Sequence, residues 1–128
     1  MTAFRDAFPI LYVADVARAT SFYEGVFGFR ESFRWPQGGK PTFAFLQLDP
    51  IGIGVAARTA EVSSVNPGRE FELCIYTDDV DAAAAKLEGA SAELVRPAAD
   101  EPWGERRAYF RDLDGHLLHV CAKLEADA

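Results

Sequence analysis

The sequence has few cysteines, little positive charge and no long apolar run, and each shortage excludes a class of protein. Its two cysteines, Cys74 and Cys121, stand far apart in the chain and outside any Cys-x-x-Cys arrangement. This spacing predicts reduced, buried thiols rather than a disulfide framework or a thiolate zinc site. No apolar stretch approaches the length of a membrane-spanning helix, and no basic segment followed by an apolar one opens the chain. We therefore expect a cytoplasmic protein with no membrane partner.

Acidic residues outnumber basic ones, with 20 Asp and Glu against 13 Lys and Arg and a net charge of −7. The field of such a protein repels phosphate backbones and anionic lipid surfaces, so nucleic acid is not an expected partner. An acidic surface suits a cationic ligand, although its commonest meaning is solubility.

The composition is that of one folded domain, because 128 residues with 49% hydrophobic and 26% charged side chains can bury a core without disulfides or a structural metal. We expect a single domain over residues 1–128 that carries one pattern twice. The first module spans about 7–57, the polar segment 58–69 links it to the second, and the second module spans about 70–123.

Each module begins with a short strand and a capped helix. Asp15 and Asp79 are N-cap candidates, and Gly28 and Gly89 follow the helical patterns as stop signals. The predicted helices cover 16–27 and 80–88, and the predicted strands cover 7–13, 29–35, 41–48, 53–57, 70–77, 92–96, 105–111 and 116–122.

Side-chain alternation groups residues on the faces of these strands. Phe29, Phe33 and Trp35 are expected on one face of their strand, and Phe43 shares a face of the next strand with Phe45. The sequence leaves open which of these faces points inward.

The two modules also share residues at equivalent landmarks: strand end, helix cap, first helical turn and helix end. Tyr12, Asp15, Val16 and Gly25 recur at one constant offset as Tyr76, Asp79, Val80 and Gly89. Duplication predicts an α+β fold in which two tandem βαβββ modules form a curved mixed sheet with an internal cup and helices outside. Such a cup is a favoured place for a small-molecule ligand.

Two stretches carry a resemblance to a known family. The segment FPILYVADVARATSFYEGVFGF over 8–29 resembles the opening strand and helix of the vicinal oxygen chelate superfamily, which contains glyoxalases, bleomycin resistance proteins and extradiol dioxygenases. The segment PWGERRAYFRDLDGHLLHV over 102–120 is similar to its closing hairpin. Pro9, the Pro-Trp-Gly over 102–104 and His119 are most similar to the bleomycin resistance proteins. That resemblance implies a homodimer that sequesters a cationic antibiotic without chemistry.

Enzymes of this superfamily hold one divalent metal, and the resemblance assigns its ligand positions here to Phe8, Glu72 and His119. Phenylalanine has no lone pair, so only Glu72 and His119 could ligate, and two side chains hold a hard cation weakly. A third ligand would have to come from Gln47, Asp6 or a thiol. We therefore expect no metal and no other cofactor, with Glu72 and His119 as the ligands if one binds.

Several of these residues also have ordinary structural explanations. Glu72 could pair with Arg69 or Arg107, and His119 could be a hydrogen-bonded imidazole lining the cup. His116 is expected to face solvent, and the Asp-Leu-Asp-Gly run over 112–115 to be a turn rather than a calcium loop.

The ligand class stays open between two chemistries. Arg107 beside Tyr109 would favour an anion, whereas the aromatic side chains suit planar rings or a cation. Trp103 could close over the pocket edge or pack at a dimer interface. We predict a metal-free small-molecule-binding protein; the alternatives are a divergent metal-dependent lyase, isomerase or dioxygenase, and a module whose cup is filled by its own side chains. The predicted ligand-binding residues are Phe8, Trp35, Phe43, Phe45, Glu72, Trp103, Arg107, Tyr109 and His119.

Overall fold

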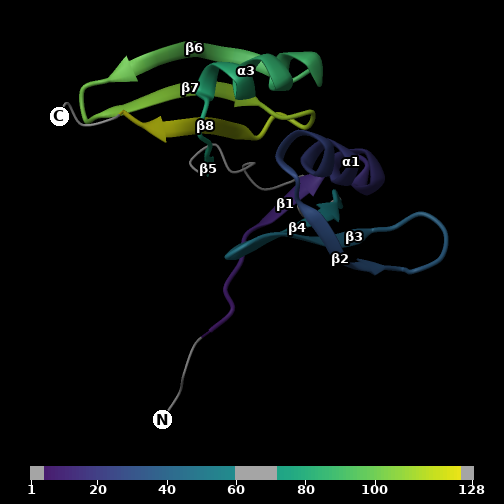
Figure 1. Ribbon diagram of the computed structural model, residues 1–128. Coiled ribbons are helices and arrows are strands. Elements are labelled where there is room, and N and C mark those ends of the chain that lie inside the picture. The colour runs from purple at the N-terminus through teal and green to yellow at the C-terminus, as the bar shows by residue number, and fades with distance from the viewer. Residues whose placement is uncertain (1–4, 60–71, 125–128) are drawn as a thin grey trace. The chain divides into compact units, whose positions relative to one another are not determined.

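The computed structural model describes residues 5–59 and 72–124, and the chain divides into two compact units, Met1–Val65 and Asn66–Ala128. Within the described residues, each unit consists of one helix and one four-stranded mixed sheet (Figure 1). The order strand, helix, three strands occurs in both, which confirms the predicted α+β fold of two tandem βαβββ modules. The predicted linker falls mostly outside the described residues, and the cup and the single domain stay predictions.

The first unit has the sheet order β1-β4-β3-β2, in which β1 runs parallel to β4 and the other neighbours are antiparallel. Its elements are β1 (Ile10–Val13), α1 (Val16–Phe27), β2 (Arg30–Trp35), β3 (Phe43–Leu48) and β4 (Ile51–Ala57).

Both ends of α1 lie where the sequence predicts them. The Asp15 carboxylate accepts a hydrogen bond from the backbone N–H of Arg18 at 3.1 Å, which satisfies one of the free donors of the first turn. Gly28 takes a φ of 82°, where a side chain would be strained, and donates its N–H to the Glu24 carbonyl. The buried side of α1 packs on the sheet, over a face whose side chains are fully buried: Ala44, Leu46, Ile53 and Val55.

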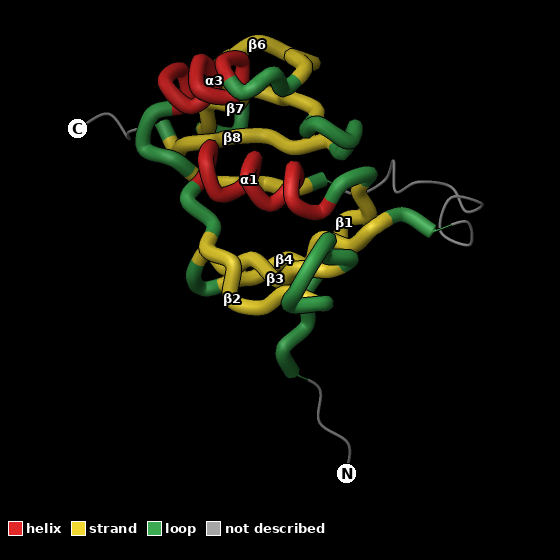
Figure 2. The backbone as a smooth tube through the Cα atoms, turned by 90° about the vertical axis from the view of Figure 1, so that its right-hand side faces the viewer, coloured by secondary structure: helices red, strands yellow, loops and turns green. Residues whose placement is uncertain are grey.

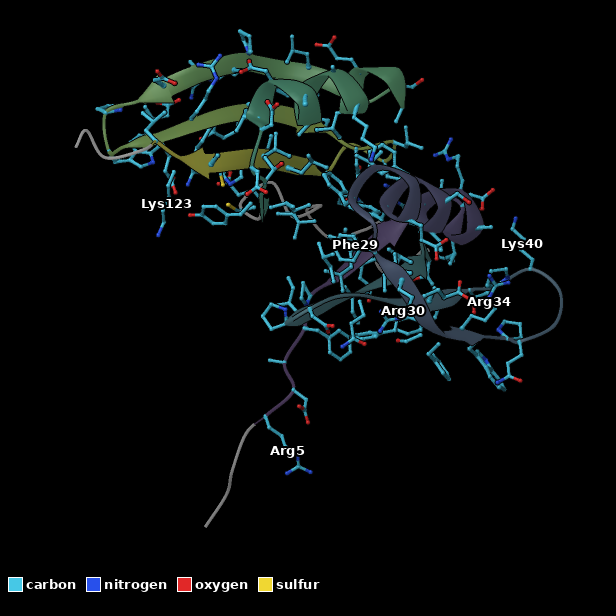
Figure 3. The ribbon with its side chains drawn as sticks, in the orientation of Figure 1. Arg5, Phe29, Arg30, Arg34, Lys40 and Lys123 are labelled. Carbon is cyan, nitrogen blue, oxygen red and sulfur yellow. The ribbon has the colours of Figure 1, made fainter. Side chains whose placement is uncertain are left out.

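A bulge in β2 overturns the predicted grouping of Phe29 with Phe33 and Trp35. The pairing of β2 with β3 shifts between Glu31 and Phe33, so that the side chains of Phe33 and Trp35 share a face with Phe43 and Phe45. Phe29 is left on the opposite, helix-covered side, where its ring lies 5.7 Å from that of Tyr23 (Figure 3). One extra residue is enough to reverse the face of every side chain beyond it.

The second unit repeats this topology with the sheet order β5-β8-β7-β6, and β5 runs parallel to β8. The two views show α3 alongside this sheet, with β6, β7 and β8 next to one another (Figure 2). Its elements are β5 (Leu73–Tyr76), α3 (Val80–Gly89), β6 (Glu93–Glu101), β7 (Glu105–Arg111) and β8 (Leu117–Lys123).

The helix α3 begins as predicted and ends one residue later than predicted. The Asp79 carboxylate caps it by accepting from the backbone N–H of Ala82 at 3.1 Å. Gly89 is still helical, because the left-handed residue that turns the chain is Ser91, with a φ of 69°. The stop predicted at Gly89 is therefore wrong by one position.

Several strand predictions also differ from the structure: β3 begins at Phe43 rather than at residue 41, and β4 begins at Ile51, inside the turn predicted before residue 53. The first strand begins at Ile10 rather than at residue 7, and β6 continues to Glu101 although its sequence contains Pro97. Proline lacks the N–H that a central strand needs, but β6 is an edge strand and its register shifts between Arg96 and Ala99. Among the described residues, none of the helices is long and apolar enough to cross a membrane.

Candidate functional site

The sheet of the second unit has two chemically different faces. Side chains that oppose each other in paired strands share a face, and one such set on β7 and β8, Ala108, Phe110, Leu118 and Val120, is buried beside α3. The opposite face is called here the polar face, and it carries Cys74, Tyr76, Glu105, Arg107, Tyr109, His119 and Cys121.

Glu105 is the centre of a hydrogen-bond network on the polar face. The hydroxyl of Tyr76 donates to its Oε2 at 2.6 Å, and the indole N–H of Trp103 donates to its Oε1 at 2.9 Å. Arg107 donates to the same Oε1 from Nε at 3.0 Å and from Nη2 at 2.7 Å. A buried carboxylate is stable only when its charge is matched in this way.

These bonds shift the pKa values of the groups that make them. Hydrogen bonds from Tyr76, Arg107 and Trp103 lower the pKa of Glu105 from 4.5 to about 2. The bond to Glu105, and then burial, raises the pKa of Tyr76 from 10.0 to about 12. Glu105 thus remains an ionised acceptor at physiological pH, and its low pKa makes it a poor general base.

Arg107 also contacts His119, which is 1% exposed. The guanidinium Nη1 lies 3.2 Å from Nδ1 and 3.2 Å from Nε2 of the imidazole. Equal distances place Nη1 on the plane that bisects the two nitrogens, away from the lone-pair direction of either one. The contact is therefore that of a cation against the ring. Burial, together with the charge of Arg107, lowers the pKa of His119 although Glu72 acts in the opposite sense, so the imidazole is neutral at pH 7.

Two arginines of this unit lie over aromatic rings. The guanidinium carbon of Arg107 is 5.4 Å from the ring centroid of Trp103, and that of Arg96 is 4.9 Å from the ring of Tyr109. Both arginines are already paired with carboxylates, since Arg96 binds Glu101 at 2.9 Å and Arg107 binds Glu105. Their charges are therefore balanced within the unit.

The first unit carries an aromatic counterpart to the polar face. Its aromatic face is the side of the sheet opposite α1, and it consists of Phe8, Ile10, Phe33, Trp35, Phe43 and Phe45. The ring of Phe8 lies 4.9 Å from that of Phe45, and a Cβ added at Gly52 would overlap the Phe45 ring. The absence of a side chain at Gly52 is therefore what allows this ring to lie flat on the sheet.

The metal ligands implied by the fold family do not fit the described residues. No group of three His, Cys, Asp or Glu side chains that could hold a metal occurs in residues 5–59 and 72–124. Glu72 Oε1 and His119 Nε2 are 3.7 Å apart, but the third implied position is Phe8. A metal bound about 2.1 Å from either ring nitrogen would also lie within about 5 Å of the Arg107 guanidinium, and like charges that close repel.

The structure places the predicted site residues in two groups. Glu72, Trp103, Arg107, Tyr109 and His119 belong to the second unit, and Phe8, Trp35, Phe43 and Phe45 to the first. Their roles in ligand binding stay predictions.

One partnership considered for Glu72, the pair with Arg107, is wrong. The carboxylate that binds Arg107 is Glu105, not Glu72, because positions 105 and 107 share a face of β7 while Glu72 lies near His119. Arg69, the other partner expected for Glu72, lies outside the described residues. The alternation of Glu105, Arg107 and Tyr109 along one strand was the available signal for this pairing.

The turn before β8 corrects a second expectation. His116 does not face solvent freely, because its Nδ1 lies 2.9 Å from Oδ2 of Asp112. The same Asp112 carboxylate accepts from the backbone N–H groups of Asp114 and His116, each at 2.9 Å. These bonds make the segment an Asx-type turn, as predicted in place of a calcium loop.

Tandem βαβββ units, each with one helix and one four-stranded mixed sheet, define the structural class of this chain. The family profile described as Glyoxalase/Bleomycin resistance protein/Dioxygenase superfamily matches residues 7–120. The chain belongs to this superfamily.

Solved structures agree with that assignment. TioX from Micromonospora sp. ML1 is 29% identical, with a TM-score of 0.75 and coverage of 94% of this chain and 100% of TioX. A glyoxalase/bleomycin resistance protein/dioxygenase family enzyme from Burkholderia phytofirmans PsJN is 24% identical, with a TM-score of 0.78 and coverage of 90% and 95%. The fosfomycin resistance protein FosX from Mesorhizobium loti is 20% identical, with a TM-score of 0.69 and coverage of 95% and 93%. Among curated proteins, none matches the chain.

Proposed function

We propose that this protein binds and sequesters a flat aromatic ligand, such as an antibiotic, without a metal and without converting it. The observation that carries the proposal is the position of Arg107, whose Nη1 lies 3.2 Å from both nitrogens of His119. A fixed cation stands there beside the one imidazole that the family pattern would use as a ligand. A surface that holds no metal can still bind a small molecule. The aromatic and charged side chains of the two sheets support ligand binding and not metal-dependent chemistry.

The aromatic face supports a planar ligand. Trp35 is 61% exposed and Phe33 is 48% exposed, although both are large apolar side chains on a sheet. Exposed aromatic rings in a row are unusual on a soluble surface and are typical of ligand-binding surfaces.

The polar face of the second unit, taken by itself, favours a positively charged ligand group over a negatively charged one. The two arginines that lie over aromatic rings are each paired with a carboxylate. Glu72, in contrast, is 45% exposed and has the neutral imidazole of His119 at 3.7 Å. A cation that binds the polar face would therefore meet the carboxylate of Glu72, whereas an anion there would compete with Glu105 and Glu101 for their arginines.

We further propose that the protein acts as a cytoplasmic homodimer and that binding an antibiotic protects the cell. FosX proteins carry fosfomycin resistance in their names, and resistance by binding is compatible with the family. Light scattering of the purified protein tests the dimer, and growth of a sensitive host with and without the gene tests resistance.

The ligand test uses the two tryptophans, which lie in different units. Trp103→Phe leaves Trp35 as the only tryptophan. Proflavine, a planar cation, should quench the tryptophan emission and raise the melting temperature. Phe33→Ala in that background should weaken binding about 2- to 10-fold through lost stacking. Ile51→Ala, at an exposed apolar residue on the opposite face, is the matched control and should bind normally.

The competing reading is a divergent lyase, isomerase or dioxygenase that uses Glu72 and His119. The 3.7 Å approach of these two side chains is the observation in its favour. If neither proflavine nor metal-free bleomycin shifts the melting temperature or quenches Trp35, sequestration of an aromatic cation is contradicted. Turnover of a catechol or hemithioacetal that is lost on Glu72→Gln would then favour the enzyme.

A further inference from the structure

The parallel pairing of β5 with β8 brings together the two cysteines of the chain. Their Sγ atoms are 3.3 Å apart, although 46 residues separate them in the sequence. In the register of the two strands Cys74 opposes His119 and Cys121 opposes Tyr76, so both thiols lie on the polar face. The two thiols are free, as predicted, and are neighbours in space, but Cys74 is exposed, whereas the sequence predicts it to be buried.

The two thiols have different environments. Cys74 is exposed, whereas Cys121 is 0% exposed, and its Sγ lies 3.8 Å from the carbonyl oxygen of Ile75. Burial, and then the contact with Cys74, raises the pKa of Cys121 well above its usual range. A reagent in solution can reach the first thiol and cannot reach the second, which is the arrangement of an attacking and a resolving cysteine.

We propose that Cys74 and Cys121 form a thiol–disulfide modification site, oxidised by a low-molecular-weight disulfide such as oxidised glutathione. Cys74, as thiolate, attacks one sulfur of that disulfide, whose S–S bond breaks, and one glutathione leaves and takes up the proton that Cys74 lost. Cys121 then loses its proton and attacks the Sγ of Cys74, which forms the intrachain bond and releases the second glutathione, protonated in turn. Two thiols lose two electrons and two protons, and one glutathione disulfide becomes two glutathiones.

Proximity drives the second step. The resolving sulfur is held 3.3 Å from its target, so its effective concentration far exceeds that of free glutathione. This advantage offsets the raised pKa of Cys121, which by itself would slow the attack. The mixed disulfide is therefore expected to be short-lived.

Closure of the bond would act on the Glu105 network. Cys121 lies directly opposite Arg107 on β7 and opposite Tyr76 on β5, and both of these side chains bind Glu105. A disulfide is about 2.0 Å long, so the sulfurs must move together by more than 1 Å beneath these side chains. The redox state of the pair is thereby linked to the geometry of the polar face.

Intact mass spectrometry after incubation of the native, reduced protein with oxidised glutathione tests the site. The mass of the wild type should fall by two hydrogens. No glutathione should remain attached and no disulfide should link two chains, and dithiothreitol should restore the original mass. Cys121→Ser should retain one glutathione at Cys74, and Cys74→Ser should stay unmodified while folded and react once unfolded in guanidinium. Cys121→Ala is a second variant should the serine destabilise the core.

Three results would overturn the proposal: an inert wild type, a wild type that keeps glutathione as stably as Cys121→Ser does, or a disulfide between chains. The link to the polar face has its own readout in the tryptophan emission of Trp35→Phe, in which Trp103 is the only tryptophan. Oxidation should shift the Trp103 emission reversibly and leave the Trp35 emission of Trp103→Phe unchanged. An unchanged Trp103 spectrum would contradict the link.

Discussion

Arg107 Nη1 stands 3.2 Å from both ring nitrogens of His119, so a fixed positive charge faces the imidazole of the second unit. Glu105 holds Arg107 in this position, because its carboxylate accepts hydrogen bonds from the Nε and Nη2 groups of Arg107. These bonds form within the protein and need no ligand. The superfamily pattern implies a metal ligand at His119. In this chain the same imidazole, neutral at pH 7, lies against the ion pair of Arg107 and Glu105.

Removal of the Arg107 charge should raise the pKa of His119. That pKa is lowered mainly by burial and also by Arg107, whereas Glu72 acts in the opposite sense. In Arg107→Met, NMR titration of the imidazole should show a higher midpoint for His119, with His116 as an internal reference because it is the only other histidine. Arg111→Met, further along the same strand, is the control variant. A midpoint that stays or falls in Arg107→Met would show that the guanidinium does not act on the ring.

The Glu105 network should make the fold less stable as the pH falls. The pKa of Glu105 is about 2 when folded and 4.5 as its ordinary value, so its ionised form stabilises the fold above pH 4.5 and the contribution is lost as the pH falls toward 2. Chemical denaturation between these pH values should therefore show a steeper loss for the wild type than for Glu105→Gln. Equal slopes would mean that the carboxylate is not held as described. Asp100→Asn, an exposed carboxylate bound to Arg106, controls for general charge effects.

Tyr76 should make the stability of the fold fall at alkaline pH, as Glu105 makes it fall at acidic pH. Its pKa is raised from 10.0 to about 12, so the neutral phenol stabilises the fold below pH 10 and this contribution disappears as the pH rises through 12. Phenolate absorbance should show a step near pH 12, and the amplitude of that step should fall by one tyrosine in Tyr76→Phe. In Glu105→Gln the same tyrosine should titrate nearer its ordinary value, because the acceptor that holds its proton has lost its charge. An unchanged amplitude of the late step in Tyr76→Phe would assign that step to another residue.

A side chain added at Gly52 should destabilise the fold, and one added at Gly25 should stabilise it. A Cβ at Gly52 overlaps the ring of Phe45, so Gly52→Ala is expected to cost about 1 to 3 kcal/mol through overpacking and to disturb the aromatic face. Gly25 lies inside α1 with nothing within 4 Å of its added Cβ, so Gly25→Ala should stabilise by about 0.5 to 1 kcal/mol. Urea denaturation compares both with the wild type. A neutral Gly52→Ala would show that Phe45 moves aside without cost.

Local signals in the sequence predicted most of the helix ends and the order of helices and strands. The Asp15 and Asp79 caps and the Gly28 stop depend on bonds between residues three or four positions apart, which a sequence displays directly. The duplicated order of elements follows from the same signals.

What the sequence could not show depends on register between strands. The β2 bulge that separates Phe29 from Phe33 is set by pairing with β3, and the approach of Cys74 to Cys121 by pairing of β5 with β8. Glu105 was missed for a related reason, since its donors arrive from β5, from the Trp103 loop and from its own strand. Periodicity along one segment carries no information on such contacts.

Elemental analysis of protein purified without chelators tests the central claim most directly, followed by titration with zinc, manganese, iron, nickel and cobalt ions. The account predicts far less than one equivalent of metal in the wild type and no rise in melting temperature with any of the five. About one equivalent of tightly held metal, lost on His119→Ala, would contradict it and would show that Arg107 yields its place to a cation at His119.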